Sequence, residues 1–526
     1  MSDITLSSAV RQNLLSLQAT ASLLSETQNK LSTGNKVNSA LDSPTNFFTA
    51  SALNSRSSDI NNLLDGIGNG VQILQAANTG ITSIQKLVDS AKSIANQALQ
   101  TTVGYVKSSI TSLANSTSTA SNLLGTATPT AATFTGTAAV NNLTTPASIT
   151  GTTSLTTAAN SDSLTSGFSS GDTLTINGQT LSFVASGAAG ANQINTSDTV
   201  TTLLGKIDGL TGGTGSVVTA GKLAINTGTT SDLSITSSNA NALTALGISG
   251  GVTQARTAGV PALQGKTLTI GATGGGAATS ITFGSSAGQV STLDGLNAAL
   301  ATNNLQASLD TTGKLSITTT NDAASSNIGT VAGTASSTAS IGFNGQSVVN
   351  AVKDPTSQAT RASLISQYNQ VIDQITTTAQ DSSFNGVNLL NGDTLKLTFN
   401  ETGTSKLSIA GVGFGPGGLG LSKLTAGTDF TDNAATNKTV TSLTTAATTL
   451  RSQASSFGSN LSVVQIRQDF SKSLINVLQT GASNLTLADT NEEAANSQAL
   501  STRQSIGVSA LSLANTAQQG VLQLLR

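Results

Sequence analysis

The sequence has no histidine, no cysteine and no tryptophan, and it contains a single methionine. Because imidazole and thiol groups are absent, the chain can form no Ser-His-Asp triad, no thiolate nucleophile, no disulfide and no His or Cys zinc site. These absences exclude the common forms of nucleophilic and zinc-assisted catalysis. We therefore expect a protein that is not an enzyme and that uses no cofactor and no metal.

Charge is also scarce, since charged residues make up 9% of the chain and the formal net charge is -2. Nucleic-acid binding needs clustered lysine and arginine, so no nucleic-acid partner is expected. No stretch approaches the about 18 consecutive apolar residues of a bilayer-spanning helix, so no membrane insertion is expected. Residues 1–6 show neither the basic start nor the apolar run of a signal peptide. The protein is expected to be cytosolic or to leave the cell without a cleaved signal.

Helical periodicity dominates the first hundred residues. Apolar residues spaced alternately by four and three predict a heptad seam before Gly34, which ends the helix, while Ser43 and Pro44 begin a second one. The second helix, from Pro44 to about Gln100, would be roughly 80 Å long and cannot be stable alone. The first seam contains Val10, Leu14, Leu17, Ala21, Leu24 and Leu31, and the second contains Leu53, Ile60, Leu64, Ile67, Val71, Leu74, Ile81 and Val88.

The partners of these helices are predicted at the other end of the chain. A helix over about 440–484 and a last helix to Arg526 show the same spacing, and a shorter helix is expected over about 356–382. Their seams contain Leu450, Ala454, Phe457, Leu461, Val464, Ile475 and Leu478, followed by Ala510, Leu513, Ala517 and Leu524.

The middle of the chain, about 105–355, changes to period-two apolar spacing with many turn residues, which predicts strands. A unit of roughly 90 residues occurs twice, over about 165–250 and 260–345, while 105–165 is low in complexity and indicates a linker or weak strands. The predicted fold class is multi-domain α+β. It is mainly α at the termini, as a long antiparallel bundle or coiled coil, with an inserted β-rich outer region.

Three features admit a second interpretation. Residues 413–418 fit a G-x-G-x-x-G pattern, but Pro416 favours a loop over a nucleotide site. The acidic residues Asp489, Glu492 and Glu493 fit a helix N-terminus better than a metal site. Polar residues in seam positions are expected to fix helix register rather than to bind a ligand, and they are Gln28, Asn78 and Gln85.

Four segments in order resemble the bacterial flagellin family. They are LSTGNKVNSA at 31–40, GVQILQAA at 70–77, FNGVNLL at 384–390 and QGVLQLLR at 519–526. The segment TNFFTA at 45–50 is similar to flagellins of alphaproteobacterial type. The resemblance covers about 1–104 and 356–526, so it leaves the insert undescribed.

The resemblance implies a structural subunit that self-assembles into the flagellar filament for motility. It implies an inner tube of terminal helices (1–33 with 490–526) and a helical wall (44–104 with 356–485, including a β-hairpin region near 384–430). The variable insert, 105–355, would face solvent and offer serine and threonine acceptors for an O-linked glycan. The implied location is the extracellular filament, reached by type III export, with an export chaperone, hook–filament junction proteins and cap proteins as partners.

Two alternatives remain open at this point. A hook–filament junction protein of the same family would have the same helical ends. A secreted β-rich adhesin would bind through the insert, independently of the terminal helices.

Overall fold

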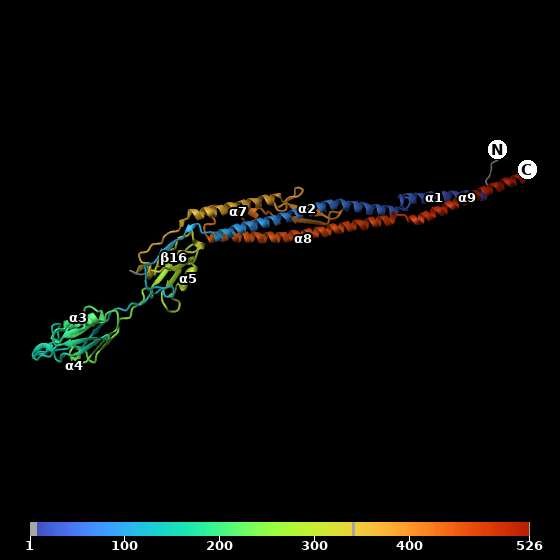
Figure 1. Cartoon of the computed structure of the whole chain (residues 1–526). Coiled ribbons are helices and arrows are strands. Elements are labelled where there is room, and N and C mark those ends of the chain that lie inside the picture. The colour runs from blue at the N-terminus through green and yellow to red at the C-terminus, as the bar shows by residue number, and fades with distance from the viewer. Residues whose placement is uncertain (1–7, 339–341, 525–526) are drawn as a thin grey trace. The chain divides into compact units, whose positions relative to one another are not determined.

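The computed structural model describes residues 8–338 and 342–524 and divides into two compact units (Figure 1). The helical unit comprises Met1–Thr102, Gln358–Phe430 and Ala435–Arg526, and the insert unit comprises Val103–Ser357 with Thr431–Ala434. Long helices at both ends and strands between them confirm the predicted α+β fold class. The expected tube and wall both lie in the helical unit, so their separation as domains stays a prediction.

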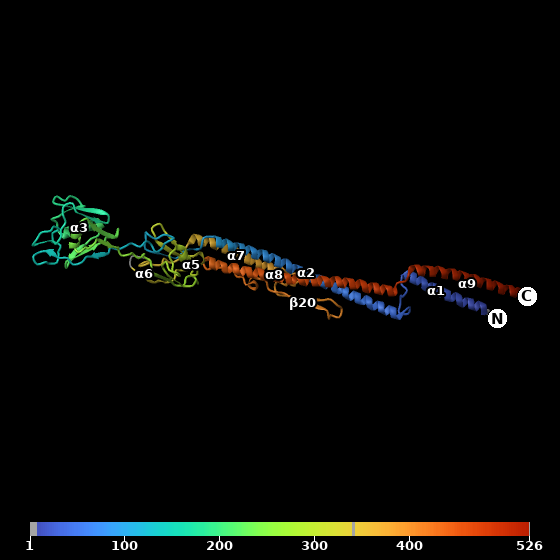
Figure 2. The ribbon, with the colours of Figure 1, turned by 90° about the horizontal axis from the view of Figure 1, so that it is seen from below.

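The long helices of the described chain ends are α1 (Ser8–Thr33), α2 (Pro44–Gln100), α7 (Pro355–Asp381), α8 (Asn433–Thr486) and α9 (Thr490–Leu524). Figures 1 and 2 show α1 alongside α9, and α2 alongside α7 and α8. The predicted start and stop signals are confirmed, because Gly34 follows α1 with a φ of 69° and Pro44 opens α2. The Asp489 carboxylate accepts the backbone N–H groups of Asn491 and Glu492 and so caps α9.

The core of the helical unit lies between α2, α7 and α8. Along α2 the fully buried positions alternate in steps of three and four, as a heptad seam requires. Within one chain the fully buried seam positions are Ala77 and Ile84, and their neighbours Asn78 and Gln85 are half-buried, so the role of these two polar residues in fixing register stays a prediction. Gln28 of α1 is exposed, and its neighbour Thr27 is buried. The buried run is Leu74, Ala77, Ile81, Ile84, Val88, Ala91, Ala95 and Ala98.

A hairpin, β19 (Thr394–Thr398) and β20 (Lys406–Ala410), packs on α2. Gly70 of α2 makes the contact close, because a Cβ there would lie 2.9 Å from Cδ1 of Leu397. The glycine-rich 413–418 segment is a loop with a short 3-10 turn, η2 (Pro416–Leu419), and begins no α-helix. The loop interpretation is therefore confirmed.

The insert unit contains two separate hydrophobic cores. We call the part from β3 to β12 the inserted module, and β2 together with β13 to α6 the interrupted module. The insert unit begins and ends in a two-stranded antiparallel ribbon. It consists of β1 (Tyr105–Val106) and β18 (Val352–Lys353).

The inserted module has a five-stranded sheet in the order β12-β11-β6-β7-β8 and a three-stranded sheet in the order β3-β10-β9. Its elements are β3 (Thr133–Thr135), β4 (Asn141–Asn142), β5 (Ser161–Leu164), β6 (Thr173–Ile176), β7 (Gln179–Val184), β8 (Gln193–Asn195), α3 (Val200–Thr211), β9 (Val217–Thr219), β10 (Lys222–Asn226), β11 (Leu233–Ser237), α4 (Ala240–Ala245) and β12 (Val252–Gln254).

The interrupted module has two three-stranded sheets, in the orders β14-β13-β17 and β15-β16-β2. Its elements are β2 (Ser109–Thr111), β13 (Thr267–Ile270), β14 (Thr279–Thr282), α5 (Leu293–Ala301), β15 (Leu305–Leu309), β16 (Leu315–Thr319), η1 (Asn321–Ala323), β17 (Val331–Ala332) and α6 (Thr334–Ser337). The low-complexity stretch 105–165 is thus no simple linker, since it supplies β2 and β3 to the two modules.

Candidate assembly surface

The terminal helices α1 and α9 contact each other, but few side chains of α1 are buried in the contact. On α1, Val10, Thr20 and Thr27 are buried. On α9, Gly507 lets the partner approach, because a Cβ there would lie 2.8 Å from Cδ1 of Leu17. Two of the three buried side chains are threonines, and apolar burial is the main stabilising term in helix pairing. The pair is therefore weakly stabilised within one chain.

The sequence-predicted seam residues of the termini fall into two groups. Val10 is buried, Leu17 and Leu24 are half-buried, and Leu14 and Leu31 are each 38% exposed. On α9, Leu513 is 73% exposed, and Ala510 and Ala517 are exposed as well. The α9 residues therefore lie outside the face that meets α1, and their role in a contact with another chain stays a prediction. Leu524 ends α9, and its side chain lies outside the described residues.

Large apolar side chains are exposed along the helical unit. Isolated exposed leucines are ordinary, but apolar residues repeated along paired helices form a surface that gains free energy when another surface covers it. They occur on α1, α2, α8 and α9, in the link between α1 and α2, and in the link between α8 and α9. The side chains are Leu15, Leu23, Leu41, Phe48, Val463, Ile466, Phe470, Val477, Leu487, Ile506, Val508 and Leu513.

The link between α1 and α2 is hydrogen-bonded to the link between α8 and α9. Backbone N–H of Lys36 donates to the Thr486 carbonyl at 2.7 Å, and the Ala488 N–H donates to the Gly34 carbonyl at 3.0 Å. In the same link, the Asp42 carboxylate accepts backbone N–H groups of its own turn, which holds its pKa below the usual range. The links are ordered turns in the chain.

The predicted wall residues are placed in the helical core or beside it. Leu64 and Leu461 are partly buried against it, and Ile60, Ile475 and Leu478 form a small cluster of their own. Sequence reasoning missed Ile73 and Ile84, although Ile84 lies on the same heptad spacing one residue from Gln85. The buried predicted residues are Ile60, Ile67, Val71, Leu74, Ile81, Val88, Phe457, Val464, Ile475 and Leu478. That these positions form a filament wall stays a prediction.

Arg361 of α7 was also missed, because nothing in its sequence context marks it. Its side chain is 2% exposed. The guanidinium donates to the carbonyl of Ala98 in the last turn of α2, to those of Thr101 and Thr102 just after the helix, and to the carbonyl of Phe430. A buried cation is thereby satisfied by carbonyls that a helix terminus leaves open. Arg361 links three segments of the helical unit.

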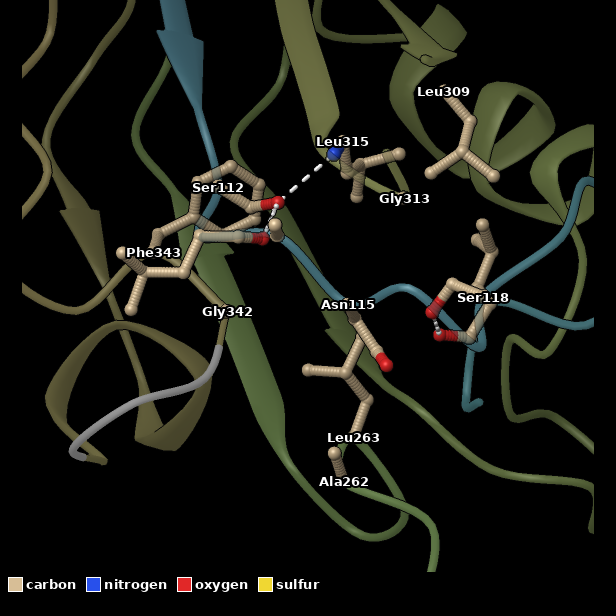
Figure 3. Close-up of a pocket in the computed structure, with 13 residues that line it drawn as sticks. Ser112, Asn115, Ser118, Ala262, Leu263, Leu309, Gly313, Leu315, Gly342 and Phe343 are labelled. Carbon is tan, nitrogen blue, oxygen red and sulfur yellow. Dashed lines mark hydrogen bonds between the residues drawn. The ribbon is translucent and has the colours of Figure 1, made fainter. Parts of the chain in front are cut away.

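No cluster of three His, Cys, Asp or Glu side chains occurs among the described residues. A cavity of about 90 Å³ in the interrupted module is lined by leucines, glycines and polar side chains without a titratable group (Figure 3). Its Ser112 hydroxyl donates to the Leu113 carbonyl and accepts the Leu315 N–H, so this hydroxyl is held in the fold. No helix of the described residues combines the length and hydropathy needed to cross a membrane.

Among the described residues, Tyr368 has a strongly shifted pKa. Burial, with a smaller contribution from the nearby Asp429 carboxylate, raises the pKa of the Tyr368 hydroxyl to about 12. Its ring packs edge-on to Phe430 with a centroid distance of 6.2 Å in the helical core. Its burial and its contact with Phe430 indicate a packing role.

Comparison with known families matches both ends of the chain. Residues 4–128 match the bacterial flagellin N-terminal helical region, and residues 440–525 match the bacterial flagellin C-terminal helical region. Residues 183–286 match a domain of unknown function, DUF1522. Both terminal matches fall on the helices that carry the exposed apolar residues.

Curated relatives agree with this class. The chain is 36% identical over 165 residues to flagellin FljM of Caulobacter vibrioides, which is 31% of this chain and 59% of the relative. It is 34% identical over 172 residues to flagellin FljO of the same organism, covering 32% of this chain and 62% of the relative. Flagellin A of Rhizobium meliloti is 40% identical over 81 residues, which cover 15% of this chain and 21% of the relative.

The two ends of the chain match the bacterial flagellin family, and they are similar to those of alphaproteobacterial flagellins. The chain spans about three fifths of the length of the Caulobacter relatives that it matches.

Proposed function

We propose that this protein is a structural subunit that self-assembles into a flagellar filament. The proposal rests on the exposed apolar side chains of α1, of α9 and of the second half of α8, from Val463 to Val477. Covering a large apolar side chain contributes about 1.5–3 kcal/mol, so repeated contacts between chains would outweigh the entropy lost on association. The same helices are the segments that match the flagellin family.

The remaining parts of the proposal follow from the family. The subunit acts outside the cell as part of the filament, and it has no enzymatic activity. Its partners are other copies of itself, a flagellar export chaperone, and the hook–filament junction and cap proteins. The exposed serine and threonine hydroxyls of the insert unit are the acceptors for an O-linked glycan, if one is attached.

The substitution Leu513→Asp tests the assembly surface. The side chain is exposed in the single chain, so the charge should leave the helix content unchanged, but burying it between subunits should cost several kcal/mol. We expect soluble protein whose rate of extension from filament seeds falls by about 100-fold or more. Electron microscopy and light scattering after seeding measure this rate.

The matched control is Asn515→Asp, which adds the same charge at an exposed α9 position on the opposite side of the helix from Leu513. It should extend seeds at nearly the rate of the parent chain. Normal extension by Leu513→Asp would show that this face takes no part in assembly. The copy number in sheared filaments separates a filament subunit from a junction protein, which would be present only at the base.

A further inference from the structure

The two modules of the insert unit share one hydrogen-bond pattern, beginning with an upstream strand. In the inserted module, β3 pairs with β10, and Gly136 N–H then donates to the Leu223 carbonyl at 2.8 Å. In the interrupted module, β2 pairs with β16, and Ser112 N–H donates to the Leu315 carbonyl at 2.8 Å. The strands therefore correspond in place and in register.

The tight turn before the second strand of each pair also matches. Gly221 has a φ of 78° and its carbonyl accepts the Ala139 N–H at 2.9 Å. Gly313 has a φ of 75° and its carbonyl accepts the Asn115 N–H at 3.2 Å. Since a left-handed backbone favours glycine, each copy needs this residue at the same point.

The first hairpin of each module repeats the correspondence. Gly171 N–H donates to the Phe183 carbonyl at 2.9 Å, and Gly265 N–H donates to the Phe283 carbonyl at 2.8 Å. Phe183 pairs in parallel with Ile194, as Phe283 does with Val290. A parallel contact after an antiparallel hairpin is an uncommon local arrangement, and it occurs at the same position in both modules.

The helices that follow are capped alike. The Thr199 hydroxyl accepts the backbone N–H three residues on at the start of α3, and the Thr292 hydroxyl does so at the start of α5. The carbonyl just before each cap accepts the N–H of a buried leucine, Leu155 in one module and Leu123 in the other, at 2.9 and 2.8 Å.

We propose that the insert consists of two copies of one fold, with the second copy lying inside a loop of the first and each copy folding as its own cooperative unit. The inserted module occupies the chain between Leu124 and Leu263. The corresponding loop of the inserted module lies between Leu155 and Phe168 and carries no further module. The copies include β2 and β3, so they extend beyond the repeat bounds that the sequence suggested.

The two segments that connect the inserted module to the interrupted module lie side by side, which favours insertion of one copy into a loop of the other. Thr130 and Thr257, just outside β3 and β12, exchange two backbone hydrogen bonds of 3.0 Å. Gly259 lies so close to the Thr128 backbone that a Cβ would overlap it. Because the chain enters and leaves at one point, the interrupted module needs no rearrangement to accept the inserted one. Each module has its own hydrophobic core.

A pair of equivalent core substitutions in the full chain tests the independence of the copies. Leu223 is fully buried in the inserted module, and Leu315 is 4% exposed in the interrupted module. For Leu223→Asn, amide hydrogen exchange should lose protection by about 100-fold or more in β10 and its sheet, with β16 unaffected. Leu315→Asn should give the reverse. Loss of protection in both modules from either substitution would overturn the proposal.

Two deletions of similar size provide a second measurement. Removal of 131–256, with Thr130 and Thr257 joined by a short Asn-Gly turn, should leave amide protection in the interrupted module unchanged. Removal of 183–286, the matched domain of unknown function, takes β8 to β12 from one copy and β13 and β14 from the other and should unfold both. Loss of the interrupted module after the first deletion would also overturn the proposal. Neither test depends on filament assembly.

Discussion

At the scale of single residues, Arg361 shows how one buried cation can hold a helix terminus. The last carbonyls of a helix have no partner within it, and four hydrogen bonds from this guanidinium satisfy such carbonyls and that of Phe430. Removing the side chain would leave these buried groups unsatisfied, whereas an exposed arginine contributes little.

We predict that Arg361→Met destabilises the helical unit by roughly 3 kcal/mol or more, because methionine fills part of the volume but donates no hydrogen bond. Chemical denaturation followed by circular dichroism measures the change. Arg451→Met, at an exposed position of α8, is the control and should change the free energy of unfolding by about 0.5 kcal/mol at most. Equal effects of the two substitutions would contradict the role of Arg361.

Asp42 gives a pH-dependent prediction. Its pKa is lowered in the folded chain by the N–H groups that it accepts, so its contribution to the link is present above the unfolded pKa and is lost as pH falls through the folded one. Amide resonances of Asn38 and Ser39 should therefore shift with a midpoint below that of an ordinary aspartate. In Asp42→Asn this titration should be absent. A midpoint above the usual aspartate range would contradict the assignment.

Most core residues of the helical unit could be predicted from apolar spacing, because burial repeats with the helical period. The exceptions have a common cause. Spacing shows that Ala510, Leu513 and Ala517 share a face, but not which face meets α1, since Leu511 and Ala514 form a second small apolar face. Arg361 could not be found, because its partners are backbone carbonyls, and these leave no mark in the sequence.

At the scale of elements, helix boundaries were predictable where glycine or proline marks them. Gly34 and Pro44 fix the end of α1 and the start of α2. The start of α8 lies at Asn433, before the expected 440, because the threonine-rich first turns carry few apolar residues. There the helix is stabilised by packing of residues such as Leu443, and local propensity gives little signal.

Packing between α2 and the chain after α7 predicts opposite effects for two glycines of α2. A Cβ at Gly80 would lie 2.7 Å from both Ser382 Cβ and Leu390 Cδ1, so Gly80→Ala should destabilise the helical unit by about 1–3 kcal/mol. At Gly66 a Cβ meets nothing within 4 Å, so Gly66→Ala should stabilise it by about 0.5–1 kcal/mol. Denaturant midpoints of the two variants, compared with the parent chain, decide the matter.

At the scale of the whole molecule, the insert could be recognised from the sequence but its limits could not. The repeats at 165–250 and 260–345 were visible because strands and turns recur in order. The first strand of each copy was missed, because β2 pairs with residues about 200 positions later, as in Ile110 with Ile317. Periodicity reports local structure, and such distant pairing is not encoded in it.

The ribbon of β1 and β18 predicts where the insert can be removed. Val106 pairs with Val352, so replacing 107–351 by an Asn-Gly turn should close the ribbon without strain. We expect a chain that keeps the stability of the helical unit within about 1 kcal/mol and still extends filament seeds, because the insert has separate cores. Failure to polymerise with an intact helical unit would show that the insert takes part in assembly.

Because the inserted module lies within the interrupted module, and the insert unit within the helical unit, the units can complete their folding only in a certain order. When a chain becomes available for folding from one end, a folding unit is complete only after the last of its strands or helices is available. Starting from the N-terminus, β12 emerges before α6, α8 and α9, and starting from the C-terminus, β3 emerges before β2, α2 and α1. Both directions therefore complete the inserted module first and the α1–α9 pair last, when the rest of the molecule has already folded.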